Sequence, residues 1–398
     1  VPYYRDLFAG MGFDPDRLTD DPAYLAKIPL LTKDIIRSQG PRLRAREIPR
    51  GLKSEDITSG GTTGAPIQFP QDSGHWAANI GTRIYQFGTL GKGLGDAEMK
   101  VWGNEGDLNK GTSGFGKRIA NFIYNRRYQG AWYLSEERIR EIIDEINHWR
   151  PRLLWCFRDG IDAIAKYVNA NGIAMHRPAA IVLGGSTVYP FVVKTVEQAF
   201  NAPVISAYGS REVGGVACEC LERKGHHISV NLARIETLDA QGRIVYEQEA
   251  ELAITGLMNY AMPFIRYRLG DRGRVTRRLC SCGRTLPLLD TVSGRLVEAF
   301  VNSRGEQIDP LYFIMSFRMS WDQGTLRQYQ IIQERDGSLT INLVPEKGYS
   351  FDTVGLDFED IRRKISRVMG ETCRVEFKLV DDIPLAASGK FPYIVRRT

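Results

Sequence analysis

The spacing of apolar side chains predicts alternating helices and strands through the middle of the chain. Residues 135–149 (SEERIREIIDEINHW) open with a serine cap and carry isoleucines at helical spacing, which predicts an amphipathic helix. Residues 162–172 predict a second helix that ends on glycine, while 151–157, 179–185 and 203–209 read as buried strands. Strands that alternate with helices favour an α/β architecture, in which ligands gather at the carboxyl ends of the strands.

The flanking regions show other patterns. Residues 1–53 contain short helical segments separated by proline and glycine, and residues 243–274 predict short strands joined by turns. Beyond about 294 the pattern predicts strands, a hairpin and one helix (DFEDIRRKISRVMG). We therefore expect a large N-terminal domain over 1–293, with a β-rich region at about 215–290, and a small α+β C-terminal domain over 294–398.

Composition narrows the class of protein. The 398 residues are 43% hydrophobic and 25% charged, as in globular proteins of two or more domains. The net charge of +6 comes from side chains scattered along the sequence, so it does not predict a nucleic-acid partner. A small polyanionic ligand such as ATP or coenzyme A is compatible with it. Neither a run of eighteen apolar residues nor a secretory signal is found, which predicts a cytoplasmic protein without a membrane partner. The opening VPYY, without an initiator Met, suggests that residues before Val1 are missing.

A glycine- and threonine-rich loop is the first candidate for chemistry. Ser59–Gly64 (SGGTTG) offers backbone N–H groups and hydroxyls that can cradle phosphates. It is not a Walker loop, because Ala65-Pro66 follows in place of Gly-Lys-Ser/Thr. Such a stretch alone is more often only a turn.

Four further segments, which follow in a fixed order, favour phosphate binding over a simple turn. Residues 207–212 (AYGSRE) place an aromatic face and a carboxylate after a strand, suited to adenine and Mg²⁺. Asp271, in RYRLGD, can accept both ribose hydroxyls, and Gly294-Arg295 follows at the expected domain boundary. Lys390, in PLAASGK, offers a cation where an attacking carboxylate meets the α-phosphate.

Together these segments resemble the signature motifs of the adenylate-forming superfamily, which comprises acyl-CoA synthetases, peptide-synthetase adenylation domains and luciferases. The run ELAITGLMNYAMPFIRYRLGD followed by CSCGRTLPLLDTVSGR is similar to the phenylacetate–CoA ligase and CapK-like branch. The resemblance covers nearly the whole chain. It implies an α/β fold with a large multi-subdomain N-terminal domain of the acyl-CoA synthetase type and a small mobile C-terminal domain.

The resemblance also implies roles for individual residues. Tyr208 would stack on adenine, Glu212 would hold magnesium, and Asp271 would bind the ribose. Arg295 would contact the nucleotide near the hinge, and Lys390 would stabilise the adenylation transition state. The implied nucleotide-binding positions are Ser59, Gly60, Gly61, Thr62, Thr63, Gly64, Gly184, Gly185, Ser186, Tyr208, Gly209, Ser210 and Asp271.

Two segments depart from the family pattern. The family hinge reads Gly-Arg-x-Asp-Asp, whereas Val297 and Glu298 occupy the acidic positions here, which weakens the case for domain rotation and the second half-reaction. The phosphate loop has Gly60 where a second serine is common and Ala65 where a lysine is common. Adenylation stays the favoured hypothesis.

Six cysteines predict a metal before a disulfide, because four of them form two Cys-x-Cys pairs in a chain without a secretory signal. Cys220, His227, Cys280 and Cys282 would fill a tetrahedral structural zinc site. The alternative is a group of reduced, partly buried thiols. Cys156 and Cys373 are expected to be packed residues.

The first hypothesis is an ATP-dependent ligase that makes an acyl-AMP from an aryl or small organic acid and transfers the acyl group to coenzyme A. The second keeps adenylation with an amine, an alcohol or a carrier-protein thiol as acceptor, for example in capsule polysaccharide or natural-product biosynthesis. A zinc-ribbon nucleic-acid-binding protein is less well supported, because no basic stripe with interleaved aromatics flanks the cysteines. A non-catalytic nucleotide-binding module is disfavoured by Lys390, and a homodimer is an open expectation.

Overall fold

The chain divides into two compact units, Val1–Val292 and Ser293–Thr398. The computed structural model describes residues 1–59, 67–102, 115–131, 134–295, 300–308, 313, 325–346, 348–350, 353–354, 356–384 and 391–397. Within these ranges, no helix combines the length and apolarity needed to span a membrane.

The N-terminal segment is built from short helices with polar caps. Its elements are α1 (Pro2–Met11), α2 (Lys33–Gln39) and 3-10 turns at Pro15–Leu18, Pro22–Lys27 and Gly40–Leu43. Asp14, Asp21 and Thr32 each accept a backbone N–H at the start of an element, which satisfies a donor that the helix itself leaves free. Phe13 stacks on Tyr24 with 4.6 Å between ring centroids, so the segment has a small core of its own.

A separate antiparallel hairpin follows, and it leads directly into a long helix. Strands β1 (Ser54–Thr58) and β2 (Gln68–Asp72) flank the glycine-rich loop, and α3 (Ser73–Gly88) begins after Asp72. The buried Asp72 carboxylate accepts the N–H of His75 at 3.0 Å and so caps α3. Its other oxygen accepts the N–H groups of Tyr260 and Ala261, at 2.6 and 3.0 Å. One carboxylate thus fixes the hairpin, the helix and a distant loop to one another.

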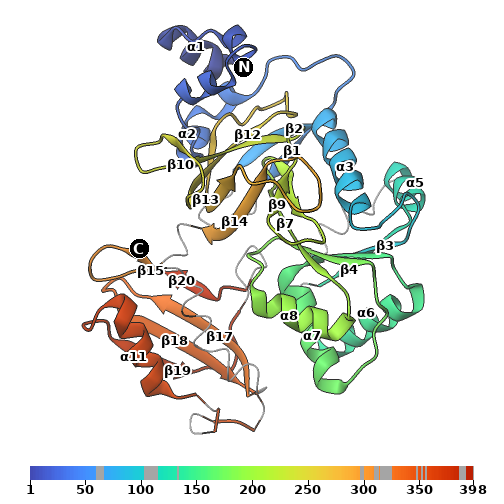
Figure 1. The fold of residues 1–398 in the computed structure, drawn as a ribbon, viewed down its shortest axis with the longest axis vertical. Helices are drawn as coiled ribbons and strands as arrows, with labels where there is room; N and C mark the ends of the chain where they lie inside the picture. The colour runs from blue at the N-terminus through green and yellow to red at the C-terminus, as the bar shows by residue number, and fades with distance from the viewer. Residues whose placement is uncertain are drawn as a thin grey trace. The chain divides into compact units, whose positions relative to one another are not determined.

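The middle of the chain forms the parallel half of a large sheet, in the order β4-β3-β5-β6-β7 (Figure 1). The strands are β3 (Glu98–Trp102), β4 (Arg126–Gly130), β5 (Leu153–Phe157), β6 (Ala180–Gly184) and β7 (Val204–Ser210). The helices are α5 (Phe115–Ile123), α6 (Glu136–Trp149), α7 (Arg158–Asn171) and α8 (Pro190–Phe200). Central strands such as β6 are buried along their whole length, as expected when helices cover both faces of a parallel sheet.

The sheet continues as an antiparallel half, in the order β7-β8-β9-β14-β13-β12-β10-β11. These strands are β8 (Gly214–Glu219), β9 (His226–Ile228), β10 (Ala233–Leu238), β11 (Ile244–Val245), β12 (Ala250–Gly256), β13 (Tyr267–Thr276) and β14 (Leu288–Arg295). A core around Phe69, Phe264 and Tyr267 joins this half to the β1–β2 hairpin.

The second unit is a small α+β structure. Strands β17 (Leu326–Gln333), β18 (Leu339–Pro345), β19 (Val375–Leu379) and β20 (Ile394–Arg396) form a sheet in the order β19-β18-β17-β20. A short hairpin pairs β15 (Phe300–Val301) with β16 (Gln307–Ile308). Helix α11 (Phe358–Met369) buries Ile361, Ile365 and Met369 on one side and keeps its charges on the other. The predicted α/β fold class is confirmed.

We predict that Asp72→Ala lowers the free energy of unfolding of the N-terminal unit by roughly 3 kcal/mol or more. Three backbone N–H groups lose their charged acceptor, and hydrogen bonds to charged groups contribute about 1.5–3 kcal/mol each. Urea denaturation of the full chain, followed by tryptophan fluorescence, measures the change. Asp34→Ala is the matched control, because that carboxylate is exposed at the start of α2, and a loss as large as that of Asp72→Ala would contradict the prediction.

Candidate nucleotide site and cysteine–histidine cluster

The structure brings Tyr208 and Asp271 together, although 63 residues separate them in the chain. Tyr208 lies near the carboxyl end of β7, and its hydroxyl donates to Oδ2 of Asp271 on β13 at 2.8 Å. Asp271 is buried, at 9% exposure. The residues expected to contact adenine and ribose therefore form one contiguous polar group.

A second tyrosine–carboxylate pair lies alongside. The Tyr267 hydroxyl on β13 donates to Oε1 of Glu212 at 3.4 Å, and Glu212 is 6% exposed in the turn between β7 and β8. Tyr267 and Asp271 are four residues apart on β13, and an irregularity in the β12–β13 pairing lies between them, where Gly270 has φ +85°. At the end of β7, just before this turn, Ser210 Oγ is buried and has no hydrogen-bond partner among the described residues. It is a candidate contact for a ligand.

The base of the glycine-rich loop is tied to that turn. Ser59 Oγ accepts the Ile67 N–H at 3.0 Å, and the Ser59 N–H donates to the Ile67 carbonyl at 2.9 Å. An Arg211 guanidinium nitrogen donates to the Thr58 carbonyl at 3.1 Å, and Gln71 Nε2 donates to the Arg211 carbonyl at 2.5 Å. Ser59 and Ile67 are thus bonded to each other between β1 and β2, and Arg211 links Thr58 to the turn that carries Glu212.

The turn after β6 lies next to β7. A Cβ on Gly184 would lie 3.4 Å from the Ala207 carbonyl oxygen, directly before Tyr208. Gly185 has φ +84°, and a Cβ there would lie 2.6 Å from the Phe157 ring, so only glycine fits. Ser186 Oγ donates to Asp159 Oδ2 at 3.4 Å, at the start of α7. Gly184 and Gly185 thus leave room for the rings of Trp102 and Phe157 at the carboxyl edge of the parallel strands.

Sequence reasoning missed the residues that hold the β7–β8 turn. Asn79 Oδ1 accepts the Gly215 N–H at 3.1 Å, and Asn79 Nδ2 lies 3.1 Å from His75 Nε2. A Cβ on Gly214 would overlap the Asn79 amide. Burial lowers the pKa of His75, against a smaller opposing effect of Asp72, which favours the neutral ring at pH 7. Lone polar residues on a helix gave no sequence signal for this role.

Some predicted residues lie outside the described part of the chain. Gly60, Gly61, Thr62, Thr63, Gly64 and Lys390 are among them. Arg295 is the last residue of β14, and its side chain is likewise outside the description. Their assigned roles stay predictions.

The four residues chosen as zinc ligands converge in space. The candidate ligand atoms of Cys220, His227, Cys280 and Cys282 all lie within 4.8 Å of one another. Cys220 Sγ is 3.7 Å from Cys280 Sγ, and Cys282 Sγ is 3.4 Å from His227 Nε2. Cys218, two residues before Cys220, lies in a separate core cluster with Phe87 and Ile205. Strand β8 ends at Glu219, so Cys220 lies beyond the strand and is not constrained to the face of Cys218.

Two of these separations, Cys220 Sγ to Cys280 Sγ and Cys282 Sγ to His227 Nε2, are close to those of a tetrahedral site. With zinc–sulfur and zinc–nitrogen bonds of about 2.3 and 2.0–2.1 Å, two sulfurs lie about 3.8 Å apart, and a sulfur and a nitrogen about 3.6 Å apart. Burial lowers the pKa of His227, with smaller contributions from Arg284 and His226, so its ring is neutral at pH 7, as a metal ligand must be. The neighbouring His226 instead places Nδ1 3.2 Å from the Leu289 carbonyl oxygen. The donor set therefore fits a closed structural site.

Comparisons with known proteins agree on the kind of protein. Residues 300–397 match the family model of the CapK C-terminal domain. The chain is 24% identical to phenylacetate-coenzyme A ligase of Thermus thermophilus, over 98% of this chain and 91% of that protein. It is 26% identical to protein CapK of Staphylococcus aureus, over 63% of this chain and 54% of that protein.

A solved structure shares the fold. The structure of 2-hydroxyisobutyryl-CoA ligase in the postadenylation state, in complex with R3-HIB-AMP, matches 99% of this chain and 85% of its own. The TM-score is 0.77 at 18% identity. The acyl-CoA synthetase type of fold, and the resemblance drawn from the ordered motifs, are thereby confirmed.

We predict that Gly209→Ala destabilises the turn that carries Ser210 and Glu212, because its Cβ would overlap the Gly214 carbonyl oxygen on β8. The expected loss in the free energy of unfolding is about 2 kcal/mol or more. Gly215→Ala is the matched control, since a Cβ there meets nothing within 4 Å, and its effect should stay within about 0.5 kcal/mol. Urea denaturation of both variants measures the difference, and equal losses would show that the close strand approach carries no cost.

Proposed function

We propose that this chain is an ATP-dependent carboxylic acid ligase that forms an acyl-AMP and transfers the acyl group to coenzyme A. In the first step a carboxylate oxygen attacks the α-phosphorus of ATP, and pyrophosphate leaves. In the second step the thiol attacks the acyl carbon, loses its proton, and AMP leaves. The ordered motifs, the relatives and the shared fold support this reaction.

The observation that carries the proposal is the hydrogen bond between Tyr208 and Asp271. It joins two motifs, each weak alone, into a site with an aromatic face and a buried carboxylate. We assign Tyr208 to the adenine and Asp271 to the ribose hydroxyls, with Ser210 Oγ as a further polar contact. Gly184, Gly185 and Ser186 would flank the base, and Ser59–Gly64 would receive the phosphates.

Charge on the phosphates needs counter-charges. We assign magnesium to Glu212, a buried carboxylate with one hydroxyl donor, Tyr267, on its Oε1. When bound, the ion would neutralise phosphate oxygens. Lys390 and Arg295 are proposed to stabilise the negative charge that develops between the attacking carboxylate and the α-phosphorus.

The relatives support two classes of acyl acceptor. Relatives named phenylacetate-coenzyme A ligase support coenzyme A and an aryl or small organic acid. The CapK relative and the CapK C-terminal domain model support the alternative of an amine, an alcohol or a carrier-protein thiol. We place the enzyme in the cytoplasm, where ATP, coenzyme A and reduced thiols coexist. A homodimer stays a prediction.

We also propose that Cys220, His227, Cys280 and Cys282 hold a structural zinc ion. All four positions would come from protein, so the ion would have no open position for catalysis. Its ligands come from the β8–β9 connection, β9 and the β13–β14 connection. The ion would therefore staple together two segments that are about sixty residues apart in sequence.

The decisive experiment is acid-dependent ATP–pyrophosphate exchange across a panel of aryl and small organic acids. We expect exchange with a subset of acids, and a fall of about 10²-fold or more in Lys390→Ala, because removing a transition-state counter-charge has effects of this size. Lys364→Ala is the matched control, since Lys364 pairs with Asp360 on the exposed face of α11, and it should exchange normally.

Acceptor identity is read in the same assay. With the cognate acid, AMP release that depends on coenzyme A supports the first hypothesis, whereas release that depends only on an amine, an alcohol or a carrier protein supports the alternative. Absence of exchange with every acid, in a protein that binds ATP, would falsify the adenylation proposal.

We predict one zinc ion per chain by inductively coupled plasma mass spectrometry. Cys282→Ser should lower zinc occupancy and the melting temperature together, because one of four ligands is lost. Cys373→Ser is the control and should keep full occupancy, since Cys373 lies in the other unit. A metal-free wild type, whose melting temperature is unchanged by chelator and by added zinc, would contradict the assignment.

A further inference from the structure

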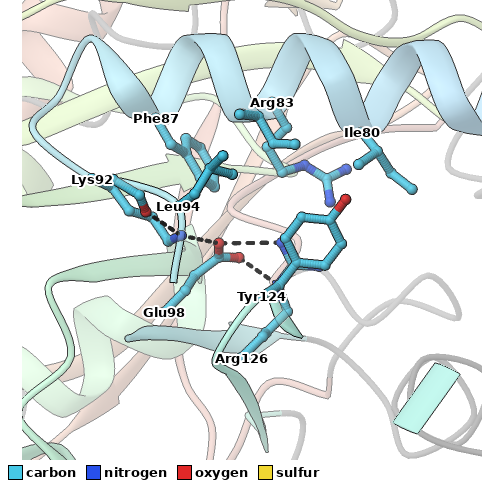
Figure 2. Close-up of a pocket in the computed structure, with 10 residues that line it drawn as sticks. Ile80, Arg83, Phe87, Lys92, Leu94, Glu98, Tyr124 and Arg126 are labelled. Atoms are coloured by element: carbon cyan, nitrogen blue, oxygen red, sulfur yellow. Dashed lines mark hydrogen bonds and ion pairs between the residues drawn. The ribbon is translucent and has the colours of Figure 1, made fainter. Parts of the chain in front are cut away.

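A polar pocket lies at the opposite edge of the parallel strands from the candidate nucleotide site. It is lined by the second half of α3, the turn before β3, and the first residues of β3 and β4, including Arg83, Lys92, Glu98 and Arg126 (Figure 2). Glu98 is the first residue of β3, whereas Gly184 and Tyr208 lie near the carboxyl ends of parallel strands. Strands of five residues separate the two edges by about 13 Å.

The pocket carries an excess of positive charge. Glu98, 1% exposed, accepts two bonds from Arg126, at 2.7 and 3.2 Å, and lies 3.7 Å from Lys92 Nζ. Arg83 is a third cation, and within the described ranges it forms no ion pair with a carboxylate. The other carboxylate of the turn, Asp96, accepts the Gly93 N–H at 2.7 Å and does not line the pocket. Three cations thus surround one carboxylate.

Arg83 is held in place by an aromatic ring. Its Cζ lies 4.0 Å from the centroid of the Trp155 ring, and Figure 2 shows its side chain extending from α3 toward Tyr124. Burial, and then the charge of Arg126, lower the pKa of Arg83 to about 10. The group therefore stays cationic at neutral pH in an environment that penalises its charge, and an anion would offset that penalty.

We propose that this pocket binds a small oxyanion, a carboxylate or a phosphate group, between Arg83, Lys92 and Arg126. The pocket volume is about 20 Å³, enough for one water-sized group, so the pocket can receive one oxygen of an anion whose remaining atoms lie toward its mouth. Ile80, Ile84 and Leu94 form an exposed apolar rim. The rim fits an oxyanion that carries an apolar substituent.

A chain of rings connects this pocket to the other edge of the sheet. Trp155, under Arg83, contacts Trp102 with ring centroids 5.3 Å apart, and Trp102 contacts Phe157 at 5.6 Å. Phe157 lies against Gly185. An anion on Arg83 would change the field at Trp155, so tryptophan fluorescence reports its binding without reference to ATP or to the ligase reaction.

The test titrates the full-length, nucleotide-free protein with sodium phosphate and, separately, sodium acetate, with sodium chloride at matched ionic strength as reference. Tryptophan fluorescence and melting temperature are both followed. We expect a saturable response to at least one oxyanion beyond the effect of chloride. The anion that gives the stronger response, phosphate or acetate, identifies whether the pocket prefers phosphate groups or carboxylates. Arg83→Gln should weaken the affinity by about tenfold or more, the effect of losing one charge-assisted bond.

Matched variants localise the response. Arg127→Gln lies one residue from Arg126 on β4, pairs with Glu145 at 3.4 Å, and should bind like wild type. Trp155→Phe should lose the fluorescence change and keep the melting-temperature shift. If Arg83→Gln fails to fold by circular dichroism, Lys92→Gln takes its place. The proposal is overturned if both anions give the same response as chloride. It is also overturned if the response is unchanged in the pocket variants, which is the result expected for phosphate bound at the Ser59–Gly64 loop.

Discussion

The buried carboxylate of Asp72 is the interaction on which the candidate site depends. It ends the hairpin that carries the glycine-rich loop, caps α3, and accepts two N–H groups from the 260–261 loop just before β13. Asn259 reinforces the joint by donating to the Pro70 carbonyl at 3.0 Å. Because these segments are nearly 190 residues apart in sequence, hydrophobic packing alone would leave their register loosely defined. Directional bonds to one acceptor define it.

These hydrogen bonds to Asp72 explain why two motifs that are weak alone form one site. Once β13 is fixed beside the hairpin, its Tyr267 meets Glu212 and its Asp271 meets Tyr208. Each buried carboxylate accepts a hydrogen bond from a tyrosine hydroxyl. A carboxylate has several lone pairs, so it can accept such a bond and also bind a metal ion or ligand hydroxyl groups.

Much of the fold followed from local patterns. The isoleucines of 135–149 predicted α6, and the glycine-rich run near Ile57 predicted a loop between strands, now seen as β1 and β2. The four chosen zinc ligands lie together in space, although the ion itself stays a prediction. What the sequence could not supply were contacts set by tertiary approach. The amide of Asn79 under Gly214, and the pocket around Glu98, depend on where α3 lies against the sheet.

The paired arginines at 126 and 127 also bear on how the large sheet ends. Strand β4 is its last strand at the parallel side, with the sequence RRYQG. An edge strand exposes unpaired backbone groups that can recruit a strand from another molecule, and adjacent positive charges oppose such pairing because two copies would repel. At the other end β11 has only two residues, too few to act as a template. Arg126, which contributes charge to the pocket, thereby also helps, together with Arg127, to keep the sheet from growing between molecules into an aggregate.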